Sequence, residues 1–380
     1  MTMDRTDVFG RAGRVVIKIG SNVLTGSFGL DRERIDSLSN QISQLIDTGL
    51  EVLLVSSGAM ACGQRKLEIY HRPEEIPKRQ AIAAVGQADL MWTYEAAFSR
   101  HNHKVAQILL TGDDLSSSRK RYLNARNTLN TLMEWRVLPI INENDTVVTE
   151  EIKFGDNDNL SALITLMMDA DVLINLTDID ALYSGDPRTE TDARKIPVVG
   201  RITKDIEHLA TGLPGALGTG GMLSKIRAAR KVTSAGIPMV IASGLRDDIL
   251  SVLFSGADEG TFFAPAGGRL PNRKCWIAFH RKPKGVLVLD DGAVQAIVRK
   301  GKSLLPSGIT SVSGEFGIGA PVAVHDGKDR WVATGLVNYA AGDIRRIMGL
   351  RTDRIRAELG QKPYDEVIHR NNMTVLGDCR

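Results

Sequence analysis

Two lysines stand in segments that suit contacts with phosphate. Lys18 lies inside the apolar run Val15–Ile19 and is followed by a glycine turn. A charged lysine in a buried strand costs several kcal/mol unless a partner neutralises it, although a lysine near a strand end could also simply reach solvent. Lys225 closes the glycine-rich segment 218–225 and opens a helical pattern, so backbone N–H groups and an ammonium could meet a phosphate together. This segment is not a Walker A loop, because no glycine precedes its lysine. Nor is it a dinucleotide fingerprint, because Leu223 replaces the third glycine.

Asparagine and aspartate gather in two further segments, Ile141–Asp145 and Gly155–Asn159. One of these residues could cap a following helix, but the density exceeds what a single cap needs. It suits a site that binds a zwitterion, a metal ion and lysines at once. The small polar segment Ser56–Ala59 could let backbone N–H groups approach an anion, or could merely form a turn. Together with Thr177-Asp178 and the two lysines, these segments indicate phosphoryl transfer.

The overall composition excludes several other classes of protein. The chain has 380 residues, of which 43% are hydrophobic and 24% charged, as in ordinary globular proteins. No apolar run approaches the ~18 residues of a membrane-spanning helix, and the first residues do not read as a signal peptide. The three cysteines are far apart, which disfavours a disulfide scaffold or a zinc cluster and fits a reducing cytoplasm.

The first 265 residues alternate short apolar runs with longer helical patterns. The runs expected as buried strands are Val15–Ile19, Val52–Val55, Val105–Leu110, Val137–Ile141, Val172–Leu176 and Pro238–Ala242. The expected helices are Arg32–Asp47, Tyr122–Trp135, a stretch from near Leu160 to Met168, and Ile226–Ala235. Repeated strand–helix–strand units predict an open, mainly parallel sheet covered by helices. Ligands of such sheets bind at the carboxyl ends of the strands, where the polar segments lie.

After the Gly- and Pro-rich stretch 264–271 the pattern changes to short strands separated by turn signals, which predicts a small β-rich domain. The candidate strands are Gly285–Leu289, Pro321–Val324 and Trp331–Val337. The charge changes as well, from a net −5 over residues 1–268 to a net +8 over residues 269–380. A basic surface can attract RNA or an acidic partner, although plain solvation is the commoner explanation.

Several long strings resemble the amino acid kinase superfamily and, within it, the glutamate 5-kinases. They are Ile141–Asp145, Gly155–Ala162, Gly218–Met222, Leu123–Arg126 and Asp186–Arg188. The segment from about His280 to Gly349 is similar to the PUA domain that many of these kinases carry, so the resemblance spans nearly the whole chain. Ser21 and Ser224 stand where threonine is usual, but each keeps a hydroxyl group.

The resemblance implies a reaction in which ATP and L-glutamate give ADP and L-glutamyl 5-phosphate, the first step of proline biosynthesis. The nucleophile is a carboxylate with an ordinary pKa near ~4.3, so it is already ionised at neutral pH and needs no general base. The segments singled out contain no histidine, which fits that requirement. Two lysines and Mg²⁺ would stabilise the transferring phosphoryl group.

The resemblance also implies roles for particular residues. Lys18 and Lys225 are expected as catalytic residues on opposite sides of the phosphates, with Asp156 between them holding both ammonium groups. Asp158 could order the metal shell or the active-site loop. The expected glutamate-binding residues are Ser57, Asp145 and Asn157, with Asp145 facing the substrate α-ammonium. The expected nucleotide-binding residues are Lys18, Thr177, Asp178, Thr219, Gly220, Gly221, Met222, Leu223, Ser224 and Lys225. The metal ligands are left unassigned.

The same resemblance gives expectations for domains and partners. We expect an amino acid kinase domain over residues 1–265, a linker over 266–279, a PUA-like barrel over 280–353 and a tail over 354–380. Expected partners are glutamate, the co-substrate ATP with Mg²⁺, proline as a feedback inhibitor, glutamyl phosphate reductase, and further copies of the chain. RNA binding by the PUA-like domain is disfavoured, because every residue tied to the chemistry lies at or before Lys225. A cytoplasmic location is expected, with no membrane partner.

Other readings of the sequence stay open at this point. Aspartokinase-like, acetylglutamate kinase-like and uridylate kinase-like proteins belong to the same superfamily. Aspartokinases usually carry α+β regulatory repeats at this end, whereas this tail is β-rich and basic. Acetylglutamate has no free α-ammonium group for Asp145 to bind. An RNA-binding or regulatory protein with a degenerate kinase body is disfavoured, because Lys18, Asp156 and Lys225 are all present.

Overall fold

The chain divides into two compact units, Met1–Gly268 and Arg269–Arg380, in a computed structural model. The structure describes all residues except 1–3, 27–28, 72, 117, 149–156, 188, 191, 212–220, 266, 270–282 and 376–380. Each unit has its own hydrophobic core.

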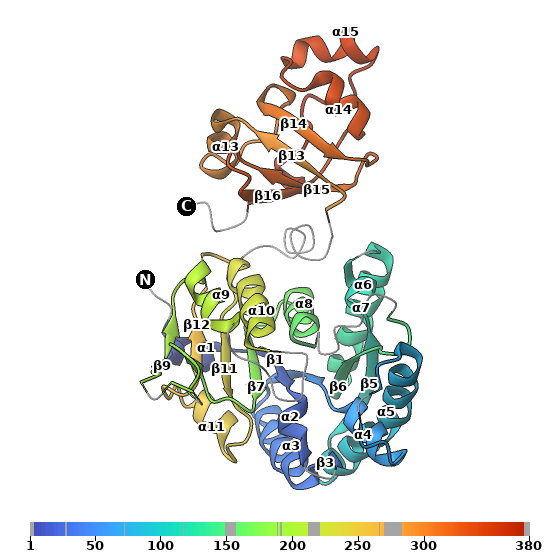
Figure 1. Ribbon diagram of the computed structural model, residues 1–380, viewed down its shortest axis with the longest axis vertical. Coiled ribbons are helices and arrows are strands. Elements are labelled where there is room, and N and C mark those ends of the chain that lie inside the picture. Colours follow the sequence, from blue (N-terminus) through green and yellow to red (C-terminus); the bar gives the residue numbers. More distant parts are fainter. Residues whose placement is uncertain are drawn as a thin grey trace. The chain divides into compact units, whose positions relative to one another are not determined.

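The first unit is built on one eight-stranded sheet (Figure 1). Its order is β10 (Val198–Val199), β12 (Thr261–Phe263), β11 (Met239–Ser243), β7 (Val172–Thr177), β1 (Arg14–Ile19), β4 (Glu51–Ser56), β6 (Val137–Glu143) and β5 (Lys104–Leu110). All neighbouring pairs are parallel except β11 with β12. Two short ribbons accompany it, β2 (Thr25–Gly26) with β3 (Gly29–Leu30) and β8 (Leu182–Tyr183) with β9 (Lys195–Ile196). The predicted fold class, a mainly parallel sheet with helices, is confirmed.

Helices cover both faces of this sheet. One face packs in the core against α1 (Arg5–Arg11), α3 (Arg32–Asp47), α5 (Ile76–Ser99) and α11 (Ile249–Phe254). The other face contacts α8 (Asn157–Met168) and α10 (Met222–Ser234), which pack against each other (Figure 1). The remaining helices are α2 (Ser21–Leu24), α4 (Ala59–Lys66), α6 (Gly112–Ser116), α7 (Arg119–Glu134) and α9 (Lys204–Thr211).

Each predicted strand of this unit is present, within two residues of its expected bounds. Helix α3 has the predicted bounds, because Asp31 caps it by accepting from Arg34 N at 2.9 Å and Gly49 follows it with φ +94°. Helix α8 begins at Asn157, three residues before the predicted start, which places Asp158 in its first turn. Helix α5 was not predicted.

The second unit is a five-stranded sheet with three short helices among its described residues. The strand order is β14 (Ile309–Gly314), β13 (Gly285–Leu289), β15 (Pro321–His325), β16 (Trp331–Leu336) and β17 (Met373–Val375). The helices are α13 (Asp291–Val298), α14 (Ala341–Ile347) and α15 (Ile355–Leu359), and 3-10 turns span Pro306–Gly308, Thr352–Arg354 and Arg370–Asn372.

The β-rich character of this unit is as predicted, but two details differ. Strand β17 pairs with β16, so residues that the sequence assigned to a separate tail form part of the sheet. The segment after Gly285–Leu289, where a turn between strands is expected, instead begins a helix: Asp291 and Gly292 form the first turn of α13, which Asp290 caps by accepting from Ala293 N at 2.7 Å. No described helix of either unit combines the length and apolarity needed to cross a membrane.

Candidate active site

The carboxylate of Asp158 binds two lysines near the middle of the first unit. Its Oδ1 lies 2.7 Å from Lys18 Nζ and accepts from Asn175 Nδ2 at 2.9 Å. Its Oδ2 lies 3.4 Å from Lys225 Nζ and accepts from Ser224 Oγ at 2.5 Å. Two donors on each oxygen hold the carboxylate in one orientation, so the two ammonium groups are kept on opposite sides of a single anion.

The strand register explains why these groups meet. Lys18 of β1 pairs with Asn175 of β7, and both side chains rise from the face that α8 covers. The neighbouring positions Ile17 and Ile174 point to the opposite face and join the core there. Asp158 approaches this face from α8, and Ser224 and Lys225 approach it from the first turn of α10. Four separate elements therefore build the cluster.

The cluster is buried, and its one carboxylate is shared by two lysines, which leaves one positive charge in excess. Asp158 is 0% exposed, Lys18 4% and Lys225 5%. Burial alone would raise the pKa of Asp158, but the two ammonium groups outweigh it and hold that pKa well below its usual range. Burial lowers the pKa of Lys18 more than the attraction of Asp158 raises it. A buried charge of this kind is tolerated only with such a partner.

A second network joins the ends of β4 and β6 to the start of α8. Asn157 Nδ2 donates to Asn142 Oδ1 at 2.9 Å, and it lies 3.1 Å from both Ser57 Oγ and the carbonyl oxygen of Ser56. Asn142 in turn donates to Gln87 Oε1 at 2.8 Å. These buried amides fix the segment that carries Ser57 beside the first turn of α8.

Asp145 lies in the turn that follows β6 and is half-buried. Burial raises the pKa of its carboxyl group to about 6. No ion pair to this carboxylate occurs among the residues that the structure describes. It therefore differs from Asp158, whose charge is matched by its neighbours.

Thr177 and Asp178 form the carboxyl end of β7. Asp178 Oδ2 accepts from Asn22 Nδ2 at 2.9 Å, and Thr177 Oγ1 donates to Asp178 Oδ1 at 3.0 Å. Burial opposes ionisation of Asp178, but these hydrogen bonds and Lys225 lower its pKa on balance. The contact joins the turn after β1 to the end of β7, on the same edge of the sheet as the lysines.

Several residues predicted for the site come together. Lys18, Lys225 and Ser224 meet at Asp158, and Ser57 meets Asn157. Gly221, Met222 and Leu223 begin α10 next to Ser224. Asp156, Thr219 and Gly220 lie outside the described residues. The position between the two lysines, expected for Asp156, is taken in the structure by Asp158.

Sequence reasoning missed Asn175 and Gln87. Asn175 is the one polar residue in the apolar run Val172–Leu176, and its register neighbour is Lys18. A polar residue beside a buried lysine was a usable signal. Gln87 gave no such signal, because only the packing of α5 brings it to Asn142.

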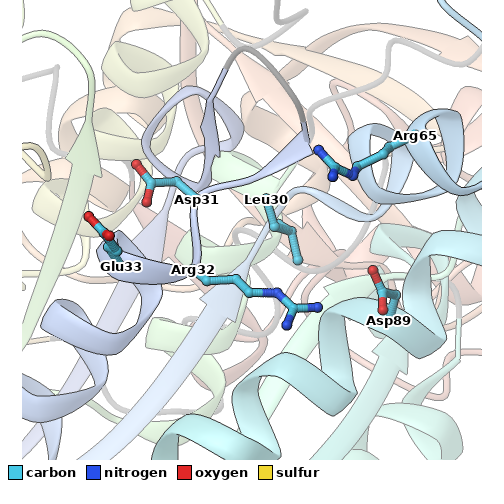
Figure 2. Close-up of a pocket in the computed structure, with 6 residues that line it drawn as sticks. All are labelled: Leu30, Asp31, Arg32, Glu33, Arg65 and Asp89. Carbon is cyan, nitrogen blue, oxygen red and sulfur yellow. The ribbon is translucent and has the colours of Figure 1, made fainter.

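A separate pocket of about 360 Å³ is lined by Leu30, Asp31, Arg32, Glu33, Arg65 and Asp89. Figure 2 shows the guanidinium of Arg32 pointing toward Asp89. Arg32 also lies over the Trp92 ring, 5.4 Å from its centre. The pocket contains none of the residues predicted for the reaction.

The sequence pattern of the amino acid kinase family matches residues 13–243, and that of the PUA domain matches residues 285–359. The chain is 51% identical over 380 residues to the glutamate 5-kinase of Syntrophus aciditrophicus (strain SB), covering 100% of this chain and 98% of the relative. It is 49% identical over 373 residues to the glutamate 5-kinase of Geobacter sulfurreducens, covering 98% of this chain and 100% of the relative. A solved structure of carbamate kinase from Giardia lamblia bound to AMP-PNP is 18% identical, with a TM-score of 0.49, over 67% of this chain and 99% of the other.

Proposed function

We propose, because the chain belongs to the amino acid kinase family and within it to the glutamate 5-kinases, that it transfers the γ-phosphoryl group of ATP to the side-chain carboxylate of L-glutamate. The products are ADP and L-glutamyl 5-phosphate, and the reaction is the first step of proline biosynthesis. The observation that carries this function is the pair of buried lysines held by Asp158 at the carboxyl ends of parallel strands.

The chemistry requires an anion to approach a polyanion. The glutamate carboxylate is ionised at neutral pH and attacks without a general base. Lys18 and Lys225 supply positive charge where negative charge develops on the phosphoryl oxygens. Asp158 lies within ion-pair distance of both ammonium groups and fixes their positions before the substrates arrive.

The amino acid end of the substrate meets a different environment. We assign the α-ammonium of glutamate to Asp145, because this half-buried carboxylate has no cation among its described neighbours. A bound ammonium would restore the ionised state that burial disfavours. Ser57 and Asn157 stand on the neighbouring strand end and helix start, where they define the rest of this pocket.

The nucleotide is assigned to the segments around Thr177, Asp178 and Gly221–Lys225. The start of α10 presents its first N–H groups on the same side as Lys225, an arrangement suited to phosphate. Thr219 and Gly220 belong to the same assignment from the sequence.

Mg²⁺ is assigned as part of the co-substrate. The described residues contain no group of three carboxylate, histidine or cysteine side chains that could hold a metal ion. Mg²⁺ with a nucleotide would be held mainly by the phosphates of ATP and by water, with one or two carboxylates of the protein. When bound, the ion neutralises charge on the phosphates.

The test of the function is a trapping assay. The protein is incubated with ATP, Mg²⁺ and hydroxylamine in separate reactions that contain glutamate, aspartate or N-acetylglutamate. The hydroxamate formed in each reaction is measured. We expect γ-glutamyl hydroxamate with glutamate and little product with the other two acids. No product with glutamate, or equal product with aspartate, would contradict the assignment.

We assign the second unit a structural or regulatory role, since every residue tied to the chemistry lies in the first unit. A chain ending after Pro265 should keep measurable kinase activity; a folded truncation with none would contradict this.

Proline inhibition, assembly of several copies, a cytoplasmic location and transfer of the product to glutamyl phosphate reductase remain predictions. Initial rates at low glutamate with millimolar proline test the first of them.

A further inference from the structure

Asn175 stands in a place where an amide destabilises the fold. It is 0% exposed in the middle of β7, between Ile174 and Leu176 along the strand. Its Nδ2 donates to Asp158, but its Oδ1 has no hydrogen-bond partner in the part of the chain that the structure describes. A buried amide oxygen without a hydrogen-bond partner destabilises the fold. An apolar side chain would suit the strand itself, so the described contact that accounts for an asparagine here is the hydrogen bond to Asp158.

The position of Asn175 in the sheet suggests why an asparagine, and not an apolar residue, stands there. One row of cross-strand neighbours runs from Val55 through Lys18 and Asn175 to Ile241. The two polar members lie side by side and donate to the same oxygen of Asp158, Oδ1. The other oxygen, Oδ2, receives Ser224 and Lys225.

The two donors to Oδ1 differ in what else they can do. Lys18 carries a charge that the proposed function also assigns to the phosphate. Asn175 has a short side chain on a central strand and carries no charge. It can therefore hold Oδ1 in place while Lys18 also faces the phosphoryl group.

We propose that Asn175 is a positioning residue for phosphoryl transfer: it fixes the Asp158 carboxylate independently of Lys18, so that both ammonium groups keep their geometry in the transition state. This inference rests on the proposed function and deepens it. It predicts a loss in turnover rather than in substrate affinity, because the geometry matters most when charge develops on the phosphoryl group.

Two substitutions test it together, Asn175→Leu and Asn175→Ala. Both remove the donor, but one enlarges the side chain and the other leaves a space, so a packing effect would separate them. We expect kcat to fall about tenfold or more in both, as is common when a partner that orients an active-site ligand is removed. The KM values for glutamate and ATP should stay within about twofold of the unsubstituted protein.

The matched control is Ile174→Val, which trims a core residue on the same strand but on the opposite face. It should lower the melting temperature while leaving kcat within about twofold. Circular dichroism checks that each variant is folded.

The proposal is overturned if either folded Asn175 variant keeps kcat within twofold, or if the loss appears in KM alone. It is also overturned if kcat follows melting temperature across all three variants. If one Asn175 variant does not fold, the other decides. Failure of the proposed function is distinguishable, because the unsubstituted protein would then form no γ-glutamyl hydroxamate.

Discussion

Asp158 and Asp145 lie near the same edge of the sheet, yet their surroundings are opposite. Asp158 is fully buried and contacts two ammonium groups, a hydroxyl and an amide. Burial would raise its pKa, but the two ammonium groups and the Ser224 hydroxyl hold that pKa well below the usual range. Asp145 is half-buried without a described cation, and burial raises its pKa to about 6. Cations of the protein compensate the charge of Asp158. On the proposed assignment, a bound ligand compensates the charge of Asp145.

The difference indicates that the phosphate side of the site, around Asp158, and the proposed amino acid side, around Asp145, have different functions. The phosphate side is organised before substrates bind, so its charges need little rearrangement during the reaction. On the proposed assignment, the amino acid side holds the Asp145 carboxylate at a cost to stability and recovers that cost when the substrate ammonium binds. Changes on the first side should alter turnover, and changes on the second should alter affinity for glutamate.

The largest expected effect is the loss of a lysine. Lys18→Ala or Lys225→Ala should each lower kcat about 10²–10³-fold, because a preorganised charge is removed from the transferring group. Steady-state rates with glutamate and ATP measure it. The matched control is Arg227→Ala, which removes an exposed cation from the same helix and should change kcat less than twofold. A folded lysine variant that keeps a tenth of the activity would refute the assigned role.

Asp145→Asn should change the affinity for glutamate rather than turnover. Loss of the partner of a bound ammonium typically costs 2–5 kcal/mol, so the KM for glutamate should rise about 100-fold. The KM for ATP should stay nearly constant and serves as the internal control. Equal increases in both constants would place Asp145 outside the amino acid pocket.

A smaller effect should appear in the pH profile. On the proposed assignment Asp145 must be ionised to bind the α-ammonium, and it gains a proton as the pH falls through about 6. The kcat/KM for glutamate should therefore fall about tenfold per pH unit below that point. In Asp145→Asn this acid limb should be absent. An unchanged limb in the variant would assign it to a different group.

The strands of the first unit could be predicted because buried parallel strands read as uninterrupted apolar runs. Helix α5 could not, because its buried stripe includes Gly86, Gln87 and Thr93 while the large apolar Trp92 is exposed, so the stripe does not read as an apolar pattern. A Cβ on Gly86 would lie 1.8 Å from the carbonyl oxygen of Ala59, so only glycine permits the approach of α4 here. Strand β14 has exposed, polar residues at most positions and gave no apolar run.

The site was predictable in its residue types but not in its contacts. The segment Gly155–Asn159 offers two aspartates two residues apart, and which of them faces the lysines depends on where α8 begins. The helix starts at Asn157, earlier than its apolar pattern indicates, and this places Asp158 opposite β1 and β7. Asn175 and Gln87 act through tertiary contacts that no local pattern encodes.

The most direct test of the central comparison is the melting temperature of Asp158→Asn and Asp145→Asn at pH 8, without substrates. Asp158→Asn leaves two buried lysines without their anion and should lower the melting temperature by about 5–10 °C. Asp145 has a folded-state pKa raised above its ordinary value, so its ionised form costs stability above pH 6. Asp145→Asn removes that cost and should leave the melting temperature unchanged or higher. A loss of similar size in both variants would contradict the account.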